Sequence, residues 1–272
     1  MVVFPVAKIN LGLRITAKRT DGYHDIETIF YPVMLCDALE IVVAEKQDGK
    51  DHLTTTGIDT GSDPESNLVI KTTKRLREKY FFPYLNIHLH KVIPVGAGLG
   101  GGSSDAACLL RALNRVFRLN LSKDEIKTYS LETGSDCPFF IDGVPSLATG
   151  RGEILQHINP FLEGYYLTLL NPGVEISTRD AYQNCIPNIP SSSLEQLIKR
   201  PINEWKGLII NDFEDFAFKK YPIIGEIKEE LYNAGAIFSL MSGSGSSVYG
   251  IFREKPDLPD FLKRYVIFEG SI

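Results

Sequence analysis

Hydrophobic residues in the first half of the chain recur with two different spacings, which predicts a mixture of strands and helices. β-Branched and aromatic residues are concentrated in three segments that each predict a strand: Val3–Ile15, Asp25–Leu35 and Leu39–Ala44. Leu85–His90 alternates strictly between apolar and polar residues, which predicts a half-buried strand. Asn67–Tyr80 instead places its apolar residues at helical spacing, with lysines and arginines on the other faces.

Two more helices are predicted beyond a glycine-rich segment. Ala106–Phe117 has the hydrophobic pattern of a helix. Glu125 follows Ser122 by three positions, which is the spacing of a capping box. We therefore expect a further helix to begin at Ser122 and to end at Gly134.

The second half of the chain has a different pattern, from about Asn159 onward. It predicts a strand, two helices, two short strands flanking a glycine-serine loop, a helix and a last strand: Tyr165–Leu170, Ser177–Asn184, Pro222–Ala234, the strands around Ser242–Ser247, Pro259–Tyr265 and Val266–Glu269. This order is close to β-α-β-β-α-β, a ferredoxin-like arrangement. We predict an α+β fold with two domains, 1–158 and 159–272, and an active site in the cleft between them.

The charge balance narrows the classes of partner. Lysine and arginine total 29 against 34 aspartate and glutamate residues, a net charge of −5, which argues against nucleic-acid and membrane partners. The four cysteines lack metal-binding spacing, which indicates reduced thiols. The uncharged segment Leu231–Phe252 is too rich in glycine and serine to span a bilayer. We expect a cytoplasmic protein that binds anions through main-chain amides and individual lysines.

The most informative segment is a glycine-rich loop. Glycine fills five of the seven positions from Gly96 to Gly102, directly before Ser103 and Ser104. An ordinary turn needs only one or two glycines. Each further glycine costs conformational entropy on folding, so five of them indicate a specific role for the backbone here. Successive main-chain N–H groups ahead of a helix N-terminus form a binding site for phosphate. Lys91, which ends the preceding strand, is expected to border the nucleotide.

Three common types of glycine-rich loop do not fit this sequence. Gly96-x-Gly98-x-x-Gly101 matches the dinucleotide-binding pattern, but a helix is predicted where a Rossmann unit requires its second strand. A Walker A loop requires a lysine at the position of Ser103. Neither the His-Arg-Asp nor the Asp-Phe-Gly sequence of protein kinases occurs in the chain.

Five segments together resemble one family. Pro94–Ala107 is similar to the phosphate loop of the GHMP kinases, which include galactokinase, homoserine kinase, mevalonate kinase and phosphomevalonate kinase. Ala7–Leu11 with Arg19–His24, then Gly134–Phe140, and Met241–Ser247 are similar to other motifs of this family. Three features resemble the branch that acts on a cytidine-diphosphate-linked methylerythritol in the methylerythritol phosphate route to isoprenoids: Asp21-Gly22-Tyr23-His24, the triple glycine before Ser103, and Gly134–Phe140.

The resemblance spans nearly the whole chain and implies both a fold and an activity. The fold would combine an N-terminal domain like domain 2 of ribosomal protein S5 with a ferredoxin-like C-terminal domain. The activity would be ATP-dependent phosphorylation of a hydroxyl of the cytidine-diphosphate-linked substrate, with Mg²⁺ accompanying ATP. Asp136 would accept the hydroxyl proton, and Lys8 would keep that carboxylate charged.

The resemblance also implies binding residues. ATP would contact the loop residues Pro94, Val95, Gly96, Ala97, Gly98, Leu99, Gly100, Gly101, Gly102, Ser103 and Ser104. Tyr23 and Tyr182 would stack on the two faces of cytosine, and His24 would bind the edge of the base. Asn10 and Thr178 would bind the hydroxyls or the diphosphate of the substrate.

Each of these residues also has a simpler structural interpretation, and the family has other activities. Asp136 and Thr178 are each compatible with a helix N-cap, and Tyr182 with ordinary helix packing. Ser103 and Ser104 are compatible with capping a helix, with binding phosphate or with reaching Mg²⁺. The alternative functions are a kinase for homoserine or a mevalonate-type alcohol and a non-catalytic ligand sensor. The metal ligands stay unassigned, and a monomer and a homodimer both stay open.

Overall fold

The chain forms two compact units that are interleaved along the sequence. Unit 1 comprises Met1–Ala7, Met34–Val95 and Gly100–Gly143, and unit 2 comprises Lys8–Val33, Gly96–Leu99 and Val144–Ile272. The computed structural model describes residues 1–61 and 63–272. The sequence-based domain limits, 1–158 and 159–272, stay a prediction.

Unit 1 contains a four-stranded sheet in the order β1-β4-β6-β5. Its strands are β1 Val2–Val3, β4 Ala38–Val43, β5 His52–Gly57 and β6 Leu85–Lys91. β4 pairs antiparallel with β1 and β6, whereas β5 runs parallel to β6. Buried and more exposed residues alternate along β6, which confirms the strand predicted from its alternating sequence.

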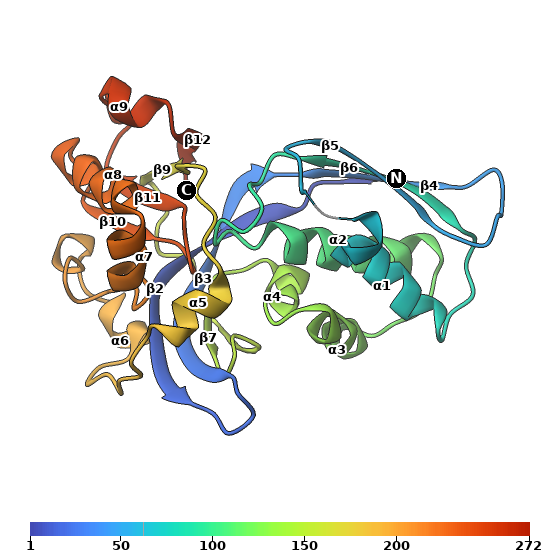
Figure 1. Cartoon of the computed structure of the whole chain (residues 1–272). Helices are drawn as coiled ribbons and strands as arrows, with labels where there is room; N and C mark the ends of the chain where they lie inside the picture. Colours follow the sequence, from blue (N-terminus) through green and yellow to red (C-terminus); the bar gives the residue numbers. More distant parts are fainter. Residues whose placement is uncertain (62) are drawn as a thin grey trace. The chain divides into compact units, whose positions relative to one another are not determined.

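Helices lie on one face of this sheet (Figure 1). They are α1 Leu68–Arg77, α2 Gly101–Val116, α3 Lys123–Thr133 and α4 Cys137–Asp142, with a short 3₁₀ turn at Pro64–Ser66 before α1. Two of their starts follow from local capping. The Asn67 side chain accepts a hydrogen bond from the Val69 N–H at 2.9 Å. The capping box predicted at Ser122 and Glu125 is present.

Helix α2 begins five residues before the predicted start at Ala106, and that prediction is therefore wrong. The sequence pattern did not indicate the true start at Gly101, because glycine has a low helix propensity. Packing fixes the first turn instead: a Cβ on Gly101 would lie 2.9 Å from Ile93 Cγ2 and 3.2 Å from Lys91 Nζ. Ser103 and Ser104 consequently belong to the first turn of the helix.

Unit 2 contains most of a sheet in the order β2-β3-β7-β8. Its strands are β2 Val6–Lys18, β3 His24–Cys36, β7 Ser146–Thr149 and β8 Ile154–His157. The single strand predicted from Val3 is wrong at its start, because β1 ends at Val3 and β2 begins only after Pro5. Consecutive residues of β2 from Ala7 to Ile15 are buried, so both faces of this strand are covered.

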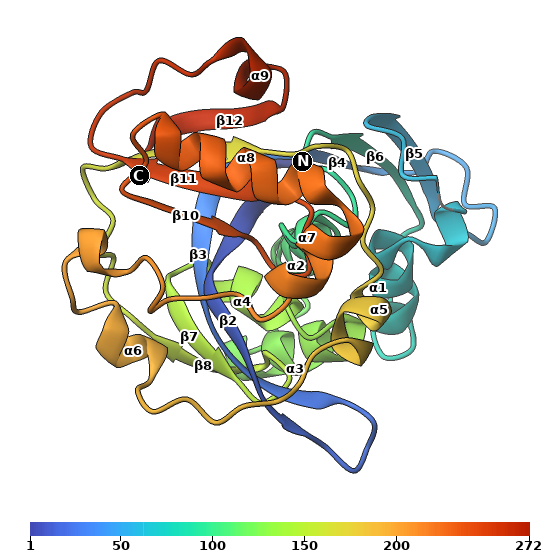
Figure 2. The same ribbon diagram turned by 60° about the vertical axis from the view of Figure 1, so that its left-hand side comes forward.

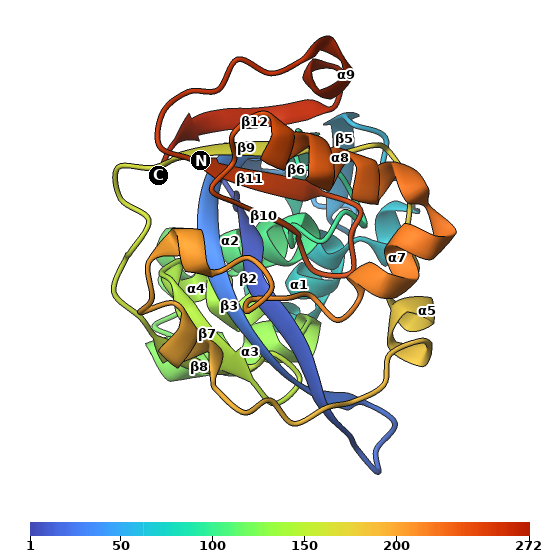
Figure 3. The ribbon, with the colours of Figure 1, turned by 90° about the vertical axis from the view of Figure 1, so that its left-hand side faces the viewer.

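The C-terminal sheet of unit 2 has the order β10-β11-β9-β12, and neighbouring strands are antiparallel (Figure 3). Its strands are β9 Tyr166–Leu170, β10 Phe238–Met241, β11 Val248–Phe252 and β12 Val266–Ser271. Numbered within this half of the chain, the strands lie in the order second, third, first, fourth. This order confirms the ferredoxin-like prediction.

The helices of this half include the three that the sequence predicts. They are α5 Thr178–Gln183, α6 Leu194–Leu197, α7 Glu214–Lys220, α8 Pro222–Asn233 and α9 Asp260–Lys263, with a 3₁₀ turn at Ile202–Glu204. Helix α8 packs against strands β10 and β11 (Figure 2). Among the described residues, no helix combines the length and the apolar character needed to cross a bilayer.

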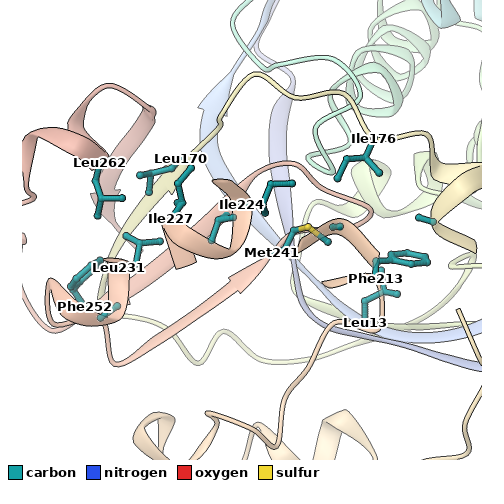
Figure 4. Packing of buried hydrophobic residues seen from close by; sticks show 14 of the residues in the cluster. Leu13, Leu170, Ile176, Phe213, Ile224, Ile227, Leu231, Met241, Phe252 and Leu262 are labelled. Carbon is teal, nitrogen blue, oxygen red and sulfur yellow. The ribbon is translucent and has the colours of Figure 1, made fainter. Parts of the chain in front are cut away.

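A hydrophobic cluster holds unit 2 together (Figure 4). Ile224, Ile227 and Leu231 recur at helical spacing on α8, and each is fully buried. They pack in one cluster with Leu13 of β2 and Met241 of β10. Burial of each such side chain contributes about 1.5–3 kcal/mol. The cluster therefore fixes β2, which carries Lys8 and Asn10, against the C-terminal sheet.

Candidate active site

Lys8 lies on β2 with its side chain buried and is hydrogen-bonded to the glycine-rich loop. The residue is 3% exposed. Its ammonium donates to Asn10 Oδ1 and, at 3.0 Å, to the carbonyl oxygen of Gly98. Its main-chain N–H donates to the carbonyl oxygen of Leu99 at 3.0 Å. A buried ammonium is costly unless it has acceptors, and two carbonyl-type oxygens supply them here. The predicted lysine is thus attached to the predicted phosphate loop.

Asn10 follows Lys8 by two positions, so the two side chains lie on the same face of β2. Its side-chain amide donates to Thr28 Oγ1 at 2.8 Å, and its main-chain N–H donates to Ser242 Oγ at 3.1 Å. The hydroxyl of Tyr249 donates to its carbonyl oxygen at 3.0 Å. This network fixes the Asn10 oxygen that accepts from Lys8. Asn10, predicted to bind substrate, is 1% exposed.

The C-terminal glycine-serine loop lies directly against the phosphate loop within unit 2. A Cβ on Gly98 would lie 1.9 Å from the carbonyl oxygen of Ser242, so only glycine fits this position. Gly98 also has a positive φ of 77°, which glycine adopts without strain. The hydroxyl of Ser242 donates to the Gly98 carbonyl oxygen at 2.9 Å. Met241–Ser247 therefore supports the loop that carries Gly98.

The rest of the predicted phosphate loop belongs to unit 1 and ends in the first turn of α2. Gly100 is the N-cap residue with a φ of 70°, and no side chain caps the helix. The first N–H groups of a helix have no intrahelical acceptor, so those of Gly101, Gly102 and Ser103 are directed at whatever lies beyond the N-terminus. The helix dipole makes this end positive. The arrangement suits a phosphate group.

Asp136 directly precedes α4, in the N-cap position, but its side chain does not cap this helix. Its backbone conformation is helical, with φ −83° and ψ −16°. The interpretation of Asp136 as a residue whose carboxylate caps the helix is therefore wrong. The residue is half-buried, and its neighbours Cys137 and Phe139 are buried. Lys8 is in unit 2, whereas Asp136 is in unit 1.

The aromatic residues predicted to bind cytosine, Tyr23, His24 and Tyr182, all belong to unit 2. The rings of His24 and Tyr182 are stacked, with centroids 5.0 Å apart and planes inclined by 19°. Tyr182 also packs edge-on against Phe213 at 4.9 Å. Tyr23 is 55% exposed, and the guanidinium of Arg151 lies 4.9 Å from its ring centroid. Burial and the nearby Lys18 lower the pKa of His24 below 6.5, which favours a neutral imidazole at pH 7.

The structure distinguishes Ser177 from Thr178 as the residue that caps helix α5. Ser177 caps α5, because its side chain accepts from the Asp180 N–H. Thr178 is the first residue of that helix, and its hydroxyl lies 3.1 Å from Ser244 Oγ. The N-cap interpretation of Thr178 is therefore wrong, and its hydroxyl lies against the C-terminal glycine-serine loop.

Several supporting residues were not predicted from the sequence. Thr28 and Tyr249 orient Asn10, and Asn211 donates to the carbonyl oxygens of Met241 and Gly243, at 2.8 Å in each case. They lie far from their partners in sequence, so no local pattern indicates them. Among residues 1–61 and 63–272, no group of three or more His, Cys, Asp or Glu side chains is arranged to hold a metal ion.

Comparison with known proteins decides the family. Residues 67–144 match the GHMP kinases N terminal domain, and residues 193–269 match the GHMP kinases C terminal domain. A 4-diphosphocytidyl-2-C-methyl-D-erythritol kinase of Bacteroides thetaiotaomicron is 51% identical over the full length of both proteins. The chain belongs to the 4-diphosphocytidyl-2-C-methyl-D-erythritol kinases, a branch of the GHMP kinases.

Other members of this kinase family agree. The enzyme of the same name from Cytophaga hutchinsonii is 45% identical over 94% of each chain. A crystal structure of 4-(cytidine 5'-diphospho)-2C-methyl-D-erythritol kinase matches with a TM-score of 0.76 and 30% identity, over 97% of this chain and 93% of the other. Homoserine kinase from Cytophaga hutchinsonii, at 19% identity and a TM-score of 0.60, shows the shared fold alone. As a GHMP kinase, the chain is an ATP-dependent small-molecule kinase, which confirms the enzyme class expected from the sequence.

Proposed function

We propose that the enzyme phosphorylates the 2-hydroxyl of 4-diphosphocytidyl-2-C-methyl-D-erythritol with ATP, giving the 2-phosphate and ADP, in the methylerythritol phosphate route to isoprenoid precursors. The names of the relatives support this substrate. The observation that carries the chemistry is the hydrogen bond from the buried Lys8 ammonium to the Gly98 carbonyl oxygen. It joins a positively charged group to the loop that would bind the triphosphate.

The loop residues Pro94 to Ser104 would bind the phosphates of ATP through main-chain N–H groups. The absence of a side-chain cap on α2 supports this role, because the first amides of the helix are left to an outside acceptor. Hydrogen bonds from N–H groups to a charged phosphate contribute about 1.5–3 kcal/mol each. Five glycines allow the backbone to approach the phosphates closely.

Mg²⁺ would accompany ATP and reduce the negative charge of its β- and γ-phosphates. The ion prefers hard oxygen ligands, and hydroxyls of serine at a phosphate loop are of this type. Ser104 Oγ is buried and has no hydrogen-bond partner within the described part of the chain, so this oxygen is not committed to a structural bond. Ser103 or Ser104 would therefore supply a hydroxyl to the ion.

Asp136 would accept the proton of the substrate hydroxyl, and Lys8 would stabilise the oxygen as it attacks. Asp136 suits this task because it is half-buried beside the buried residues Cys137 and Phe139, so its carboxylate is partly removed from water. Lys8 suits its task because acceptors on Asn10 and Gly98 hold its ammonium in place. A general base contributes about 10²–10⁴-fold to the rate of such a reaction.

The cytidine would bind among Tyr23, His24 and Tyr182. A neutral imidazole carries one N–H donor and one acceptor, so it can either donate to the ring nitrogen of cytosine or accept from its amino group. The lowered pKa of His24 supports this form at pH 7. Aromatic faces at Tyr23 and Tyr182 would stack on the base, and Asn10 and Thr178 would bind the hydroxyls or the diphosphate.

The test is release of ADP from ATP with three alcohols: the cytidine-linked substrate, homoserine and mevalonate. We expect turnover with the first alone, because the other two lack a cytosine for the aromatic residues to bind. Turnover with homoserine or mevalonate would favour a sibling kinase, and none with any alcohol would favour a ligand sensor. Asp136→Asn should lower turnover by about 10²–10⁴-fold while ATP still binds. Unchanged turnover in this variant would exclude Asp136 as the base.

A further inference from the structure

Lys91 lies in unit 1 with its ammonium between two buried carboxylates. The residue is 3% exposed, and its partners Asp37 and Asp105 are 0% and 2% exposed. Its Nζ donates to Asp37 Oδ2 and, at 2.8 Å, to Asp105 Oδ2. The cluster is almost completely removed from water. Lys91 is expected from the sequence to border the nucleotide, whereas neither Asp37 nor Asp105 is among the residues assigned above to ATP or substrate.

Asp37 holds the chain where the glycine-rich loop begins. Besides its bond to Lys91, its Oδ1 accepts from the main-chain N–H groups of Val92 at 2.6 Å and Ile93 at 2.9 Å. These residues directly follow β6 and precede Pro94. One carboxylate thus fixes both the cation and the direction in which the chain leaves the sheet.

Asp105 connects the same cation to the other end of the loop. It is the fifth residue of α2, so the Lys91–Asp105 ion pair closes the segment 91–105 at its base. Gly101 lies against the ammonium, since a Cβ there would be 3.2 Å from Lys91 Nζ. Asp105 Oδ1 is buried without a hydrogen-bond partner among the described residues, and burial raises the pKa of this carboxyl to about 7.

Stability alone is a weak reason for such a cluster. A buried ion pair gains little over well-packed apolar residues, because its desolvation cost offsets the attraction. The three charged side chains instead fix the path of the chain from β6 to α2. They fix β6, the turn after it and the first turn of α2 relative to one another.

We propose that Lys91, Asp37 and Asp105 are positioning residues that hold the first turn of α2 so that the N–H groups of Gly101, Gly102 and Ser103 face the triphosphate. The proposal rests on the proposed function, because it assumes that ATP binds at this loop. We expect the cluster to affect the binding of ATP and not the binding of the cytidine-linked alcohol.

The chain offers a matched control for Asp37 within the same unit. Asp51 is also a buried carboxylate bonded to a cation and to the backbone: Oδ1 accepts from Arg77 Nη2 at 2.7 Å and from the Leu85 N–H at 2.9 Å. It holds β6 at Leu85, the end of that strand opposite to the loop. Asp37→Asn and Asp51→Asn thus remove equivalent charges at the two ends of one strand.

The experiment measures the KM values for ATP and for the alcohol, kcat and the melting temperature for both variants. We expect both melting temperatures to fall. Asp37→Asn should raise the KM for ATP by about 10-fold, as expected for loss of one strong interaction, and leave the KM for the alcohol unchanged. Asp51→Asn should change neither KM by more than about twofold, because Asp51 holds the end of β6 opposite to the loop. Equal KM values for ATP in the two variants would overturn the proposal.

A second variant and a binding measurement keep the two proposals separable. Asp105→Asn retains the size of the side chain and an oxygen that accepts from Lys91, so it tests the cluster if Asp37→Asn does not fold. It too should raise the KM for ATP, and an unchanged value would count against the cluster. Calorimetric titration of the wild-type enzyme with ADP tests the binding of nucleotide itself. Binding to the wild type with equal affinity in Asp105→Asn would refute the positioning role alone, whereas no binding to the wild type would refute the proposed function.

Discussion

The ammonium of Lys8 donates to the carbonyl oxygen of Gly98 at 3.0 Å, although 90 positions separate the two residues in the sequence. The main chain reinforces the contact, since the Lys8 N–H donates to the Leu99 carbonyl oxygen. Strand β2 therefore carries the proposed catalytic cation and anchors the phosphate loop through the same residue. This coupling predicts that a change at Lys8 affects both catalysis and the binding of ATP.

Lys8→Met keeps the length of the side chain and removes its charge. We expect kcat to fall by about 10²–10³-fold, because an electrostatic contact with the reacting oxygen is lost. The KM for ATP should rise as well, since the Gly98 carbonyl oxygen loses one of the two donors that the described residues supply and keeps the Ser242 hydroxyl. Lys228→Met is the control: it removes another partly buried ammonium of unit 2, paired with Glu214 at 2.6 Å. If the control lowers kcat as much as Lys8→Met, Lys8 has only a structural role.

Gly98→Ala tests the contact between the two glycine-rich loops. The added Cβ would lie 1.9 Å from the Ser242 carbonyl oxygen, so the backbone must move. Gly96→Ala is matched to it, because Gly96 also has a positive φ but its nearest atom, Glu175 Cγ, would be 3.7 Å away. We expect Gly96→Ala to cost about 1–2 kcal/mol of unfolding free energy and Gly98→Ala clearly more, with a larger loss of ATP affinity. Urea unfolding and ADP titration measure both quantities, and equal effects would show that the loops do not depend on each other.

Tyr182→Ala should weaken binding of the cytidine-linked alcohol and leave binding of ATP unchanged. Loss of one stacking contact costs about 1–3 kcal/mol, which corresponds to roughly 5–150-fold in KM. Tyr182→Phe retains the ring and its contacts with His24 and Phe213, so its KM should stay near the wild-type value. A comparable rise in the KM for ATP would indicate that Tyr182 only packs within unit 2.

Asp105→Asn should change the pH dependence of stability. Burial raises the pKa of Asp105 from 3.8 to about 7 in the folded protein, so the folded state binds more protons than the unfolded state between these values. Its contribution to stability is fully present below pH 3.8 and is lost as the pH rises through about 7. The asparagine variant does not titrate at this position and lacks this loss. The difference between the free energies of unfolding of the variant and of the wild type, variant minus wild type, should therefore be larger at pH 8 than at pH 5, as measured by urea unfolding. A difference that is constant between the two pH values would contradict the assignment.

The parts of the fold that the sequence predicts are those with a strong local signal. The capping box at Ser122 and the alternation in β6 are examples of such signals. Strand β5 has four exposed residues and no apolar face, and α4 has only six residues, so neither shows a period. The start of α2 at Gly101 depends on packing against Ile93 and Lys91.

The candidate site shows the same division between local and distant information. Motif resemblance indicates Lys8, Asn10 and the glycine-rich loop, because each lies within a short distinctive sequence. The bond between Asn10 and Ser242 spans 232 positions, and no local pattern contains it. The Asp37–Lys91 ion pair spans 54 positions and was hidden for the same reason. Such pairs follow only from the folded chain.

The most direct test of the account is the proton-coupled ³¹P NMR spectrum of the product formed from ATP and 4-diphosphocytidyl-2-C-methyl-D-erythritol. Carbon 2 of the substrate carries a methyl group and no hydrogen, so a phosphate on its oxygen has no three-bond coupling to a proton. We predict a new phosphomonoester signal that is a singlet, together with one ADP for each product molecule. A triplet or a doublet would place the phosphate on the primary or the secondary hydroxyl, and the absence of any new monoester signal would contradict the proposed reaction altogether.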